Sequence, residues 1–438
     1  MNDLIAHPLA YARHLAGKSQ AQLIRGMHDA ARREGLRCGA DKAAVSRWEH
    51  YVKSPDRDSQ LLIARVLGVP AGHLSLYPWP DWLPGMEEPL PLGPAYTLRA
   101  LHDAQKATMD RRSFMSLSTA SMAGLASQWA TIEPGHLASA LDRRKRVDAE
   151  LLDWLEGTSN QLNALPTERR QHAIRLMDAQ LATVTDLLTS ASYTAPLGRR
   201  LHLLAASLAT TCGWYRFDQG RHYAAGKMWT GALHAATAAG DKEFGAGVLS
   251  DFGYQSLWTG RPKAAVDHLG LALSGTQHPT ARALLHLRRS RAYAALGDRD
   301  ATLAGLTDAE HALDEAEGTT APAWCAWMSR ADLEVDSGQA LLDLGDTRRA
   351  QTRIAAGIAL LPPTRDKTRG VFLASQAKAA LNADDVEYAA HLAGQSLDIA
   401  SRIGAERCVT QVRGLARHFT KHRNVEGVSD LLHRLQVA

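Results

Sequence analysis

The sequence predicts an all-α protein in which a small N-terminal helical bundle is followed by a long α-solenoid. Apolar residues recur at helical spacing along most of the 438 residues, and alternating strand-like patterns are almost absent. A proline-rich stretch over residues 77–94 separates a short N-terminal part from the rest. From residue 142 onward, short breaks marked by glycine or aspartate recur about every 40 residues, which is typical of a repeated helix pair.

The composition is that of a globular protein with more than one folded unit. The chain is 45% hydrophobic and 22% charged, with 50 basic and 46 acidic residues. Residues 1–76 hold 11 Lys and Arg against 7 Asp and Glu, whereas the remaining residues hold 39 of each. The whole positive surplus therefore lies in the N-terminal part, as expected of a module that binds phosphates.

Four amphipathic segments follow one another in this N-terminal part. They are residues 9–15, 19–33, 42–53 and 58–67. Ser19, Asp41 and Asp56 are predicted N-caps of the second, third and fourth helices, and Gly17 and Gly68 mark predicted helix ends. Short helices in this order predict a helix-turn-helix bundle.

The third segment, residues 42–53, predicts a helix of about three turns with two different faces. Val45 and Trp48 lie three residues apart and share one face, which can pack into a core. Glu49 is expected to pair with a nearby backbone or basic group. The opposite face carries polar and small side chains: Lys42, Ala43, Ser46, Arg47 and His50.

This N-terminal part resembles the lambda-repressor-like helix-turn-helix regulators, also called the xenobiotic-response-element family. Four motifs carry the resemblance, in the order 17–23 (GKSQAQL), 45–49 (VSRWE), Pro55 and 62–74 (LIARVLGVPAGHL). They fall within residues 7–76, which is under a fifth of the chain.

The resemblance implies that Gln20 binds a phosphate and that the helix of residues 42–53 reads base edges in the major groove. Arg47 is the strongest single candidate, since a guanidinium can donate to guanine O6 and N7 together. The alternative is that Arg47 is a solvated surface arginine. The predicted DNA-contacting set is Gln20, Lys42, Ala43, Ser46, Arg47, His50 and Lys53.

One stretch departs from the family pattern. Residues 27–40 make a longer connection than the usual tight turn, and they add Arg32, Arg33 and Arg37. These arginines either extend the phosphate contacts as a basic wing or solvate a longer helix.

The expected domain boundaries follow from composition. Residues 1–76 are the helix-turn-helix domain, 77–109 a Pro-rich linker, 110–141 a connecting helical segment and 142–438 the repeat domain. Trp79 and Trp82 in the linker are expected to dock on a neighbouring domain. The segment that begins with Arg111 and Arg112 resembles a twin-arginine export signal, and the alternative is an internal helix whose small residues allow close packing.

The repeat domain shows breaks at Gly220, Gly260, Gly297, Gly345 and, more weakly, Asp384, with one interval of 48 residues against 37 to 40 for the others. Each break precedes a small residue expected at a helix crossing, namely Ala224, Ala264, Ala301, Ala350 or Ala389. An apolar stripe follows, with Leu233, Leu273, Leu313, Leu360 and Leu397. The units resemble tetratricopeptide repeats, most clearly at residues 214–224 and 253–264, which implies a right-handed solenoid with a concave groove.

That groove is expected to bind an extended peptide along the first helix of each pair. The predicted groove residues are Tyr254, Arg288, Arg291, Arg330 and Gln376. The alternative for each is an ordinary solvated position. Five tryptophans are expected in the core between helices: Trp214, Trp229, Trp258, Trp324 and Trp327.

The sequence predicts no enzyme, no cofactor and no metal site. It lacks a phosphate-cradling glycine loop, a Gly-x-Ser-x-Gly elbow and a His-Glu-x-x-His motif, and its four cysteines are scattered. His418 and His422 stand four residues apart on a predicted helix without a third ligand. No secretion signal or membrane-spanning stretch is visible, so a cytoplasmic, nucleoid-associated protein is expected.

The predicted function is that of a transcriptional regulator that binds double-stranded DNA through its N-terminal domain. The repeat domain is expected to form a homodimer and to sense a peptide, protein or small-molecule effector. One alternative is a repeat-based interaction scaffold or adaptor. Another is a protein that binds DNA ends or maintains a plasmid.

Overall fold

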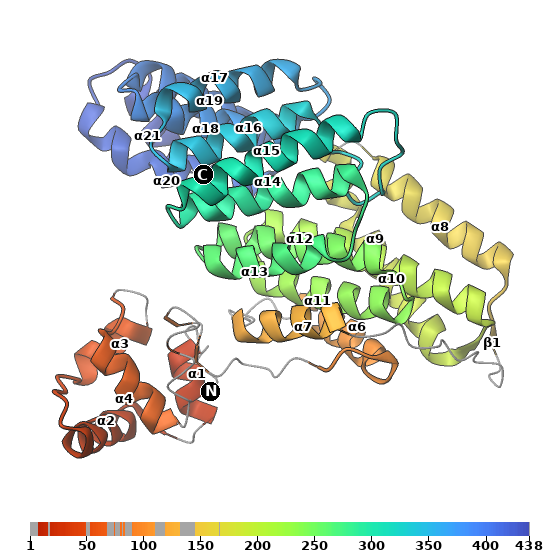
Figure 1. The fold of residues 1–438 in the computed structure, drawn as a ribbon, viewed down its shortest axis with the longest axis horizontal. Helices are drawn as coiled ribbons and strands as arrows, with labels where there is room; N and C mark the ends of the chain where they lie inside the picture. The colour runs from red at the N-terminus through yellow and green to blue at the C-terminus, as the bar shows by residue number, and fades with distance from the viewer. Residues whose placement is uncertain are drawn as a thin grey trace.

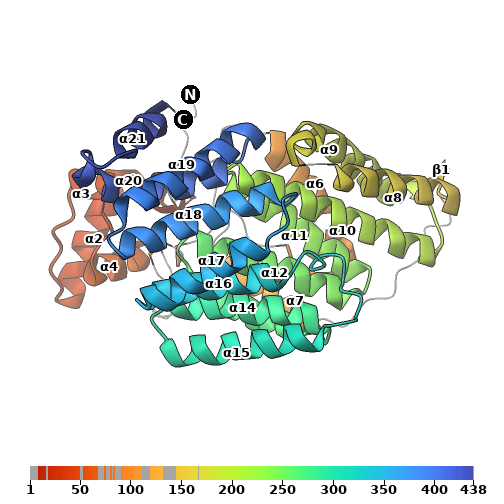
Figure 2. The same ribbon diagram turned by 90° about the horizontal axis from the view of Figure 1, so that it is seen from above.

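The computed structural model describes the chain in several stretches. These are residues 8–15, 18–49, 53–67, 74, 79–80, 82–83, 90–109, 119–131, 145–165 and 167–437. Helices dominate them, and two strands of two residues each, β1 (Lys145–Arg146) and β2 (Ala191–Ser192), pair in parallel. The prediction of an all-α protein with a helical-repeat solenoid is confirmed (Figures 1 and 2).

The N-terminal bundle consists of four helices at the predicted places. They are α1 (Pro8–Leu15), α2 (Gln20–Glu34), α3 (Lys42–Glu49) and α4 (Arg57–Leu67). Their inward faces form one core that includes Leu23, Val45, Trp48 and Ile63, each at most 6% exposed. The spacing of these residues within their helices is what allows four short amphipathic segments to share a core.

Side-chain caps start these helices as predicted. The Ser19 hydroxyl accepts from the Gln22 amide at 3.2 Å, and the Gln22 side chain accepts from the Ser19 amide at 2.6 Å. Asp41 accepts from the amide of Ala44 at 2.6 Å, which caps α3. Asp56 accepts from the amide of Ser59 at 2.8 Å and caps α4. Gly17 and Gly68 lie outside the described residues.

The long stretch between the second and third helices is mostly helix. α2 continues to Glu34 and ends at Gly35, whose φ of 67° is left-handed. Arg32 and Arg33 lie on the last turn of α2, where both contact Asp29. The structure therefore favours the second alternative for these two arginines, a solvated longer helix, and leaves only residues 35–41 as connection.

The two tryptophans that follow the bundle pack against it. Trp82 is 1% exposed within the bundle core, and its indole donates to Gln60 at 3.1 Å. Trp79 packs edge-on against it at 5.6 Å between ring centres. The two tryptophans thus dock on the bundle, which is the neighbouring domain on the N-terminal side.

Two helices precede the repeats and cover them. Residues 94–109, assigned above to the linker, form α6 (Pro94–Met109), which packs on the repeat helix α11 (His222–Ala238). α7 (Thr119–Thr131) packs against α12 (Lys242–Trp258) and α13 (Pro262–Leu273), where the Trp129 ring fills space left by Gly245 and Gly275. The latter part of the predicted linker is therefore helix, because apolar positions of α6 find a partner surface. The paired arginines at 111 and 112 lie outside the described residues.

The repeat domain opens with α8 (Ala149–Ala164) and α9 (Thr167–Ser190), and continues as helix pairs that stack side by side (Figure 2). The pairs are α10 (Ala195–Asp218) with α11, α12 with α13, α14 (Pro279–Ala295) with α15 (Arg299–Glu315), α16 (Arg330–Asp343) with α17 (Thr347–Leu360), and α18 (Asp366–Asn382) with α19 (Val386–Ile403). The end of the described chain adds α20 (Glu406–Phe419), a short 3-10 turn η1 (Thr420–His422) and α21 (Val428–Val437).

Each predicted break is the turn inside one helix pair. Gly220, Gly260, Gly297, Gly345 and Asp384 all have a left-handed φ, between 63° and 83°. Only glycine adopts this conformation without strain, so the aspartate at 384 is the costly exception. The turn geometry is the physical reason that four of these five breaks fall on glycine.

The helix-crossing and stripe residues mostly behave as predicted. Ala350 and Ala389 are fully buried at crossings, and Leu233 and Leu397 lie in the core. Ala301 is half-buried, since it lies in the first turn of α15 next to its N-cap Asp298. Leu360 was predicted in the apolar stripe but is 56% exposed, because it is the last residue of α17.

The interval of 48 residues has a structural cause. The extra residues form the connection between α15 and α16, residues 316–329, which carries Trp324 and Trp327. The Trp324 ring lies against Gly247 of α12, where a β-carbon would come within 2.7 Å of the ring. The long connection therefore reaches back across a neighbouring pair and does not simply bridge two helices.

Candidate functional site

The first helices of successive pairs share an inner face on which polar and aromatic side chains meet. Asp251 of α12 joins three pairs, because its two carboxylate oxygens face different neighbours. One oxygen accepts from the Trp214 indole of α10 at 2.9 Å, and the other pairs with Arg288 of α14 at 3.3 Å. We call the surface formed by these side chains of α10, α12 and α14, together with the side chains that contact them, the inner face.

Arg288 is the centre of an aromatic cluster. Its guanidinium carbon lies 4.9 Å from the Tyr254 ring centre, 5.7 Å from Trp327 and 5.9 Å from Trp214. The side chain is buried, and it also donates to the Ser250 hydroxyl at 2.8 Å. A cation held among aromatic rings gains from their negative faces, most strongly where water is excluded.

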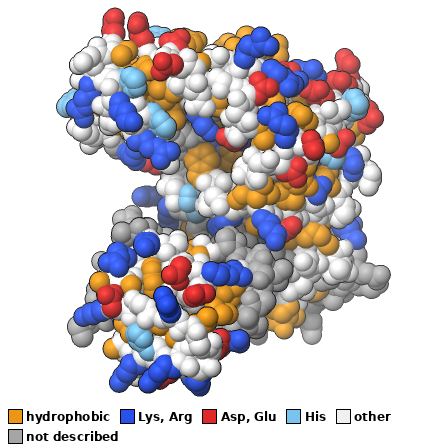
Figure 3. Space-filling view, turned by 60° about the vertical axis from the view of Figure 1, so that its left-hand side comes forward, with side chains coloured by type: hydrophobic (Ala, Val, Ile, Leu, Met, Phe, Trp, Pro, Cys, Tyr) orange, Lys and Arg blue, Asp and Glu red, His pale blue; other side chains and the backbone are white. Residues whose placement is uncertain are grey.

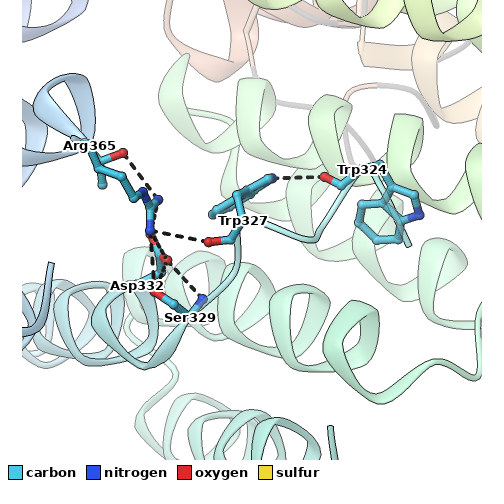
Figure 4. A network of polar contacts seen from close by, with 6 residues as sticks. Trp324, Trp327, Ser329, Asp332 and Arg365 are labelled. Atoms are coloured by element: carbon cyan, nitrogen blue, oxygen red, sulfur yellow. Dashed lines mark hydrogen bonds and ion pairs between the residues drawn. The ribbon is translucent and has the colours of Figure 1, made fainter. Parts of the chain in front are cut away.

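Trp327 of the long connection also contacts a second arginine, Arg365 at the start of α18, as Figure 4 shows. Arg365 makes two hydrogen bonds of 2.8 Å to the carboxylate of Asp332, and its guanidinium also donates to the Trp327 carbonyl at 3.3 Å. The Trp327 indole donates back to the Trp324 carbonyl at 3.0 Å. Trp327 is thereby held near both Arg288 and Arg365, with 43% of its surface still exposed.

A third group connects the first pair to the last ones. Asp218, at the end of α10, forms ion pairs with Lys367 of α18 and with Arg407 of α20, the latter at 3.5 Å. Arg407 also donates to the Tyr254 hydroxyl at 3.3 Å and lies 5.9 Å from the Phe217 ring centre. Asp218 and Lys367, which are 149 residues apart in sequence, therefore meet across the inner face.

Burial raises the pKa of two carboxyl groups on the inner face. Burial raises the pKa of Asp251 to about 6, although Arg288 and the Trp214 indole oppose the rise. Burial also raises the pKa of Asp336, which pairs with Arg291 at 3.2 Å. The inner face thus combines cations, carboxylates and aromatic rings in a poorly hydrated place.

Three of the five predicted groove residues belong to this cluster. Tyr254 and Arg288 lie at its centre, and Arg291 lies one turn further along α14. Arg330 does not join them, because it faces Asp314 of α15 at 3.2 Å. Gln376 also points away, toward the Tyr388 hydroxyl of α19 at 3.4 Å. A polar position on a first helix can also face the second helix of a pair, and a role of these two residues in the groove stays a prediction.

Several members of the inner face were not predicted. Asp218, Asp251, Lys367 and Arg407 carry no motif, and the curvature of the solenoid alone brings them together. The core prediction holds for Trp229, which is fully buried, whereas Trp327 lies half-exposed on the inner face. The long break interval was the only signal in the sequence for the connection that carries Trp327.

The bundle presents a second candidate surface on α3. Lys42, Ala43 and Arg47 are exposed, Ser46 is partly exposed, and Val45 and Trp48 on the other side are buried. Lys53 is exposed just beyond the helix, and His50 lies outside the described residues. Figure 3 shows Lys and Arg side chains distributed over the bundle at the lower left. The faces of α3 are those that the periodicity predicted.

Glu49 fixes α3 against its neighbours. Its carboxylate accepts from Arg13 of α1 at 2.9 Å and from the side-chain amide of Gln20 at 2.6 Å. Arg13 also donates to the Lys18 carbonyl at 2.9 Å. Gln20 therefore lies at the junction of α2 and α3, with its amide group engaged by Glu49.

A hollow of about 650 Å³ opens beside this junction. It is lined by Arg13, Lys18, Ser19, Gln20, Ala21, Ile24 and Lys42. The start of α2 carries the positive end of the helix dipole, and the two lysines add to this charge. The hollow is suited to a phosphate or another anion.

The histidine pair near the end of the chain does not form a metal site in the described residues. His418 lies on α20 and His422 on the following 3-10 turn, and both line a hollow together with Arg417 and Lys421. Within the described stretches, no group of three or more His, Cys, Asp or Glu side chains is placed to hold a metal ion.

Comparisons of the chain with known proteins find remote similarities to solved structures alone. No family model matches it, and no curated protein does. Among solved structures, BtubC (BKLC) from P. vanneervenii is 14% identical with a TM-score of 0.35, over 52% of this chain and 92% of that one. A Rap protein complexed with Competence and Sporulation Factor is 13% identical with a TM-score of 0.42, over 73% and 97%.

A monomeric IFIT1 mutant with Gppp-AAAA is 11% identical, with a TM-score of 0.33, over 99% of this chain and 91% of that one. Likenesses at this level concern the architecture alone. The chain has a tetratricopeptide-like helical-repeat domain. Within the described residues, no helix has the length and apolar character needed to cross a membrane.

Proposed function

We propose that this chain is a DNA-binding transcriptional regulator whose repeat domain binds a peptide or protein segment on its inner face. The carrying observation is α3, which presents Lys42 and Arg47 to solvent while Val45 and Trp48 anchor its other side. A short helix held rigidly by its apolar face, with exposed cations opposite, has the form needed to enter a major groove.

The hollow at the start of α2 supports the same proposal. Lys18 and Lys42 lie on its rim together with Gln20, next to the amino end of a helix. A phosphate bound there would hold α3 in register on the duplex without reading sequence. The positive surplus of residues 1–76 agrees with such a contact.

The inner face supports the second half of the proposal. It gathers aromatic and charged side chains from several helix pairs, and Trp327 is 43% exposed beside two arginines. None of these groups forms a nucleophile and base pair, so we propose binding and not catalysis. The regulator is expected to act in the cytoplasm as a homodimer on half-sites about one helical turn apart.

Selection of sites from a random duplex pool by the full chain tests the DNA half. Arg47→Ala is expected to cost about 1–3 kcal/mol on the preferred site and to relax one base position. Gln20→Ala should weaken all sequences alike. Arg348→Ala, which removes one exposed positive charge from α17, is the control. Absence of any selected site in the wild-type chain, or equal binding by Arg47→Ala, contradicts this half.

A scaffold or adaptor role is the second candidate, and the inner face favours it, because that face can work without the bundle. It predicts affinity for a protein partner with no salt-dependent DNA binding. A plasmid-maintenance role would instead give binding sites away from promoters. Chromosome-wide mapping of binding sites separates the three functions.

A further inference from the structure

We propose that the centre of the inner face is a carboxylate-binding site that Asp218 of the chain itself occupies in this structure. Its external ligand is a peptide that supplies a carboxylate, either from an acidic side chain or from a free C-terminus. The proposal rests on peptide binding by the repeat domain and specifies the chemistry of that peptide.

The first observation is that Asp218 contacts two helices from the far end of the repeat domain. Asp218 stands at the last turn of α10 and contacts Lys367 of α18 and Arg407 of α20 at the same time. These partners belong to the opposite end of the solenoid. One carboxylate therefore joins the beginning and the end of the repeat array across the inner face.

The second observation is that the ion pair between Asp218 and Arg407 is too long to be a hydrogen bond. Their contact is 3.5 Å long, and neither the Arg407 Nε nor the Asp218 Oδ1 has a hydrogen-bond partner in the described part of the chain. Arg407 makes one hydrogen bond, from Nη1 to the Tyr254 hydroxyl at 3.3 Å, although its side chain is only 12% exposed. A guanidinium offers five donors in a planar fork that fits a carboxylate with two parallel bonds.

A nearby arginine, Arg291, also has a nitrogen without a hydrogen-bond partner in the described residues. Arg291 pairs with Asp336 through Nη1 at 3.2 Å, while its Nε has no hydrogen-bond partner among the described residues. Arg365, by contrast, already holds Asp332 with two bonds of 2.8 Å. Among the inner-face arginines named above, Arg291 and Arg407 are thus the two whose Nε has no hydrogen-bond partner in the described residues.

The charge balance points to an anion. In these ion pairs five cations share four carboxylates, with Arg288, Arg291, Arg365, Lys367 and Arg407 against Asp218, Asp251, Asp332 and Asp336. Two cations share Asp218. A ligand carboxylate would neutralise the surplus and take over Arg407, and Asp218 would keep Lys367.

The aromatic surroundings favour a peptide over a small inorganic anion. Tyr254, Phe217 and Trp214 border Arg407 and Arg288, and the exposed ring of Trp327 lies on the same surface. Side chains that neighbour the ligand carboxylate can pack on these rings. Low hydration also strengthens a charge-assisted bond made there.

The experiment selects peptides from a random octapeptide library with the full chain, with free and amidated C-termini in separate pools. Selected peptides are expected to share Asp or Glu at one position, or to require a free C-terminus. Replacing that group by its amide should weaken binding to the wild-type chain about tenfold or more. This comparison changes only the ligand, so it does not depend on how any protein variant folds.

Protein variants then assign the partner. In Arg407→Gln the acidic peptide and its amide should bind alike, and Asp218→Asn should bind the acidic peptide about threefold to tenfold more tightly because the internal competitor is gone. Arg402→Gln and Asp398→Asn are matched controls, since each breaks an exposed ion pair elsewhere, Arg402 with Asp366 and Asp398 with Arg434. Both controls should bind as the wild type does.

The outcomes separate the two levels of the proposal. Selected peptides with no preference for a carboxylate, or an unchanged preference in Arg407→Gln, overturn the carboxylate site and leave peptide binding intact. If the wild-type chain selects no peptide from either pool, the proposed function of the repeat domain is overturned with it.

Discussion

The bundle and the repeat domain use their positive charges in opposite ways. On α3, Lys42 and Arg47 are exposed and form no ion pair within the described residues. On the inner face, Arg288 and Arg407 are largely buried and paired with carboxylates. Exposed cations attract a polyanion through many weak, screened contacts, whereas buried ones act at short range and demand a matching partner. The difference indicates which region binds a polymer and which one selects a ligand.

Despite this difference, the two regions have one structural feature in common. Each holds a buried carboxylate between helices, Glu49 in the bundle and Asp251 in the repeats. Glu49 accepts from Arg13 and Gln20. Asp251 is paired as well, yet burial raises its pKa. Burial of the Asp251 charge is therefore only partly offset by its partners.

The largest expected effect concerns the apolar packing on which the inner face stands. Trp229 of α11 is fully buried against Gly213, so Trp229→Ala should destabilise the repeat domain by about 3–5 kcal/mol. Urea unfolding followed by circular dichroism measures the loss. Trp154→Ala is the control, because Trp154 is 65% exposed and its removal should change little. Equal effects of the two would contradict the assignment of the core.

Next in size is the buried pair of the bundle. Glu49→Gln removes the charge that Arg13 faces at 2.9 Å and should destabilise the bundle by about 3 kcal/mol. Hydrogen exchange of the α1–α3 amides reports the bundle separately from the repeats. Arg47→Gln, on the exposed side of the same helix, should leave this exchange unchanged. Faster exchange in Arg47→Gln would contradict the assignment of Glu49 as the structural charge and Arg47 as the exposed one.

The pH dependence of stability tests the costly burial of Asp251. Because its pKa is raised to about 6 in the folded chain, the folded state holds this proton more tightly than the unfolded state does. The contribution of Asp251 to stability should therefore fall as pH rises from about 4 to about 6. Asp251→Asn should flatten this part of the stability profile. Asp343→Asn, at an exposed ion pair, should leave the profile as in the wild type.

The smallest effect is expected at a helix start. Ser19→Ala removes the hydroxyl that accepts from the Gln22 amide and should cost about 1 kcal/mol of bundle stability. The same hydroxyl lines the hollow beside α2, so phosphate affinity gives a second measurement. Ser19→Asp keeps the cap and should restore stability while it weakens anion binding. Restoration of both would place the anion elsewhere.

Much of the fold could be predicted because its signals are local. The four bundle helices and their caps at Ser19, Asp41 and Asp56 depend on residues within a few positions of each other. The repeat breaks were predictable for the same reason, since a left-handed turn selects glycine. The predicted segment 19–33 and the observed end of α2 at Glu34 differ by one residue, and the left-handed Gly35 is the local signal that ends the helix.

The candidate site was predictable only in part. Tyr254, Arg288 and Arg291 were expected from their place on first helices and meet on the inner face, whereas Arg330 and Gln376, expected by the same rule, contact second helices. A helix has several polar directions, and only the packing of neighbouring pairs decides which of them faces inward.

By itself the sequence determined the all-α class, the helix starts and the positions of the turns, since periodicity, caps and left-handed glycines act over one or two helical turns. Only the tertiary structure decided that Asp218 would meet Lys367 and Arg407. A small rotation between successive helix pairs accumulates over the whole array. It brings the two ends together across the inner face, and no local pattern encodes that sum.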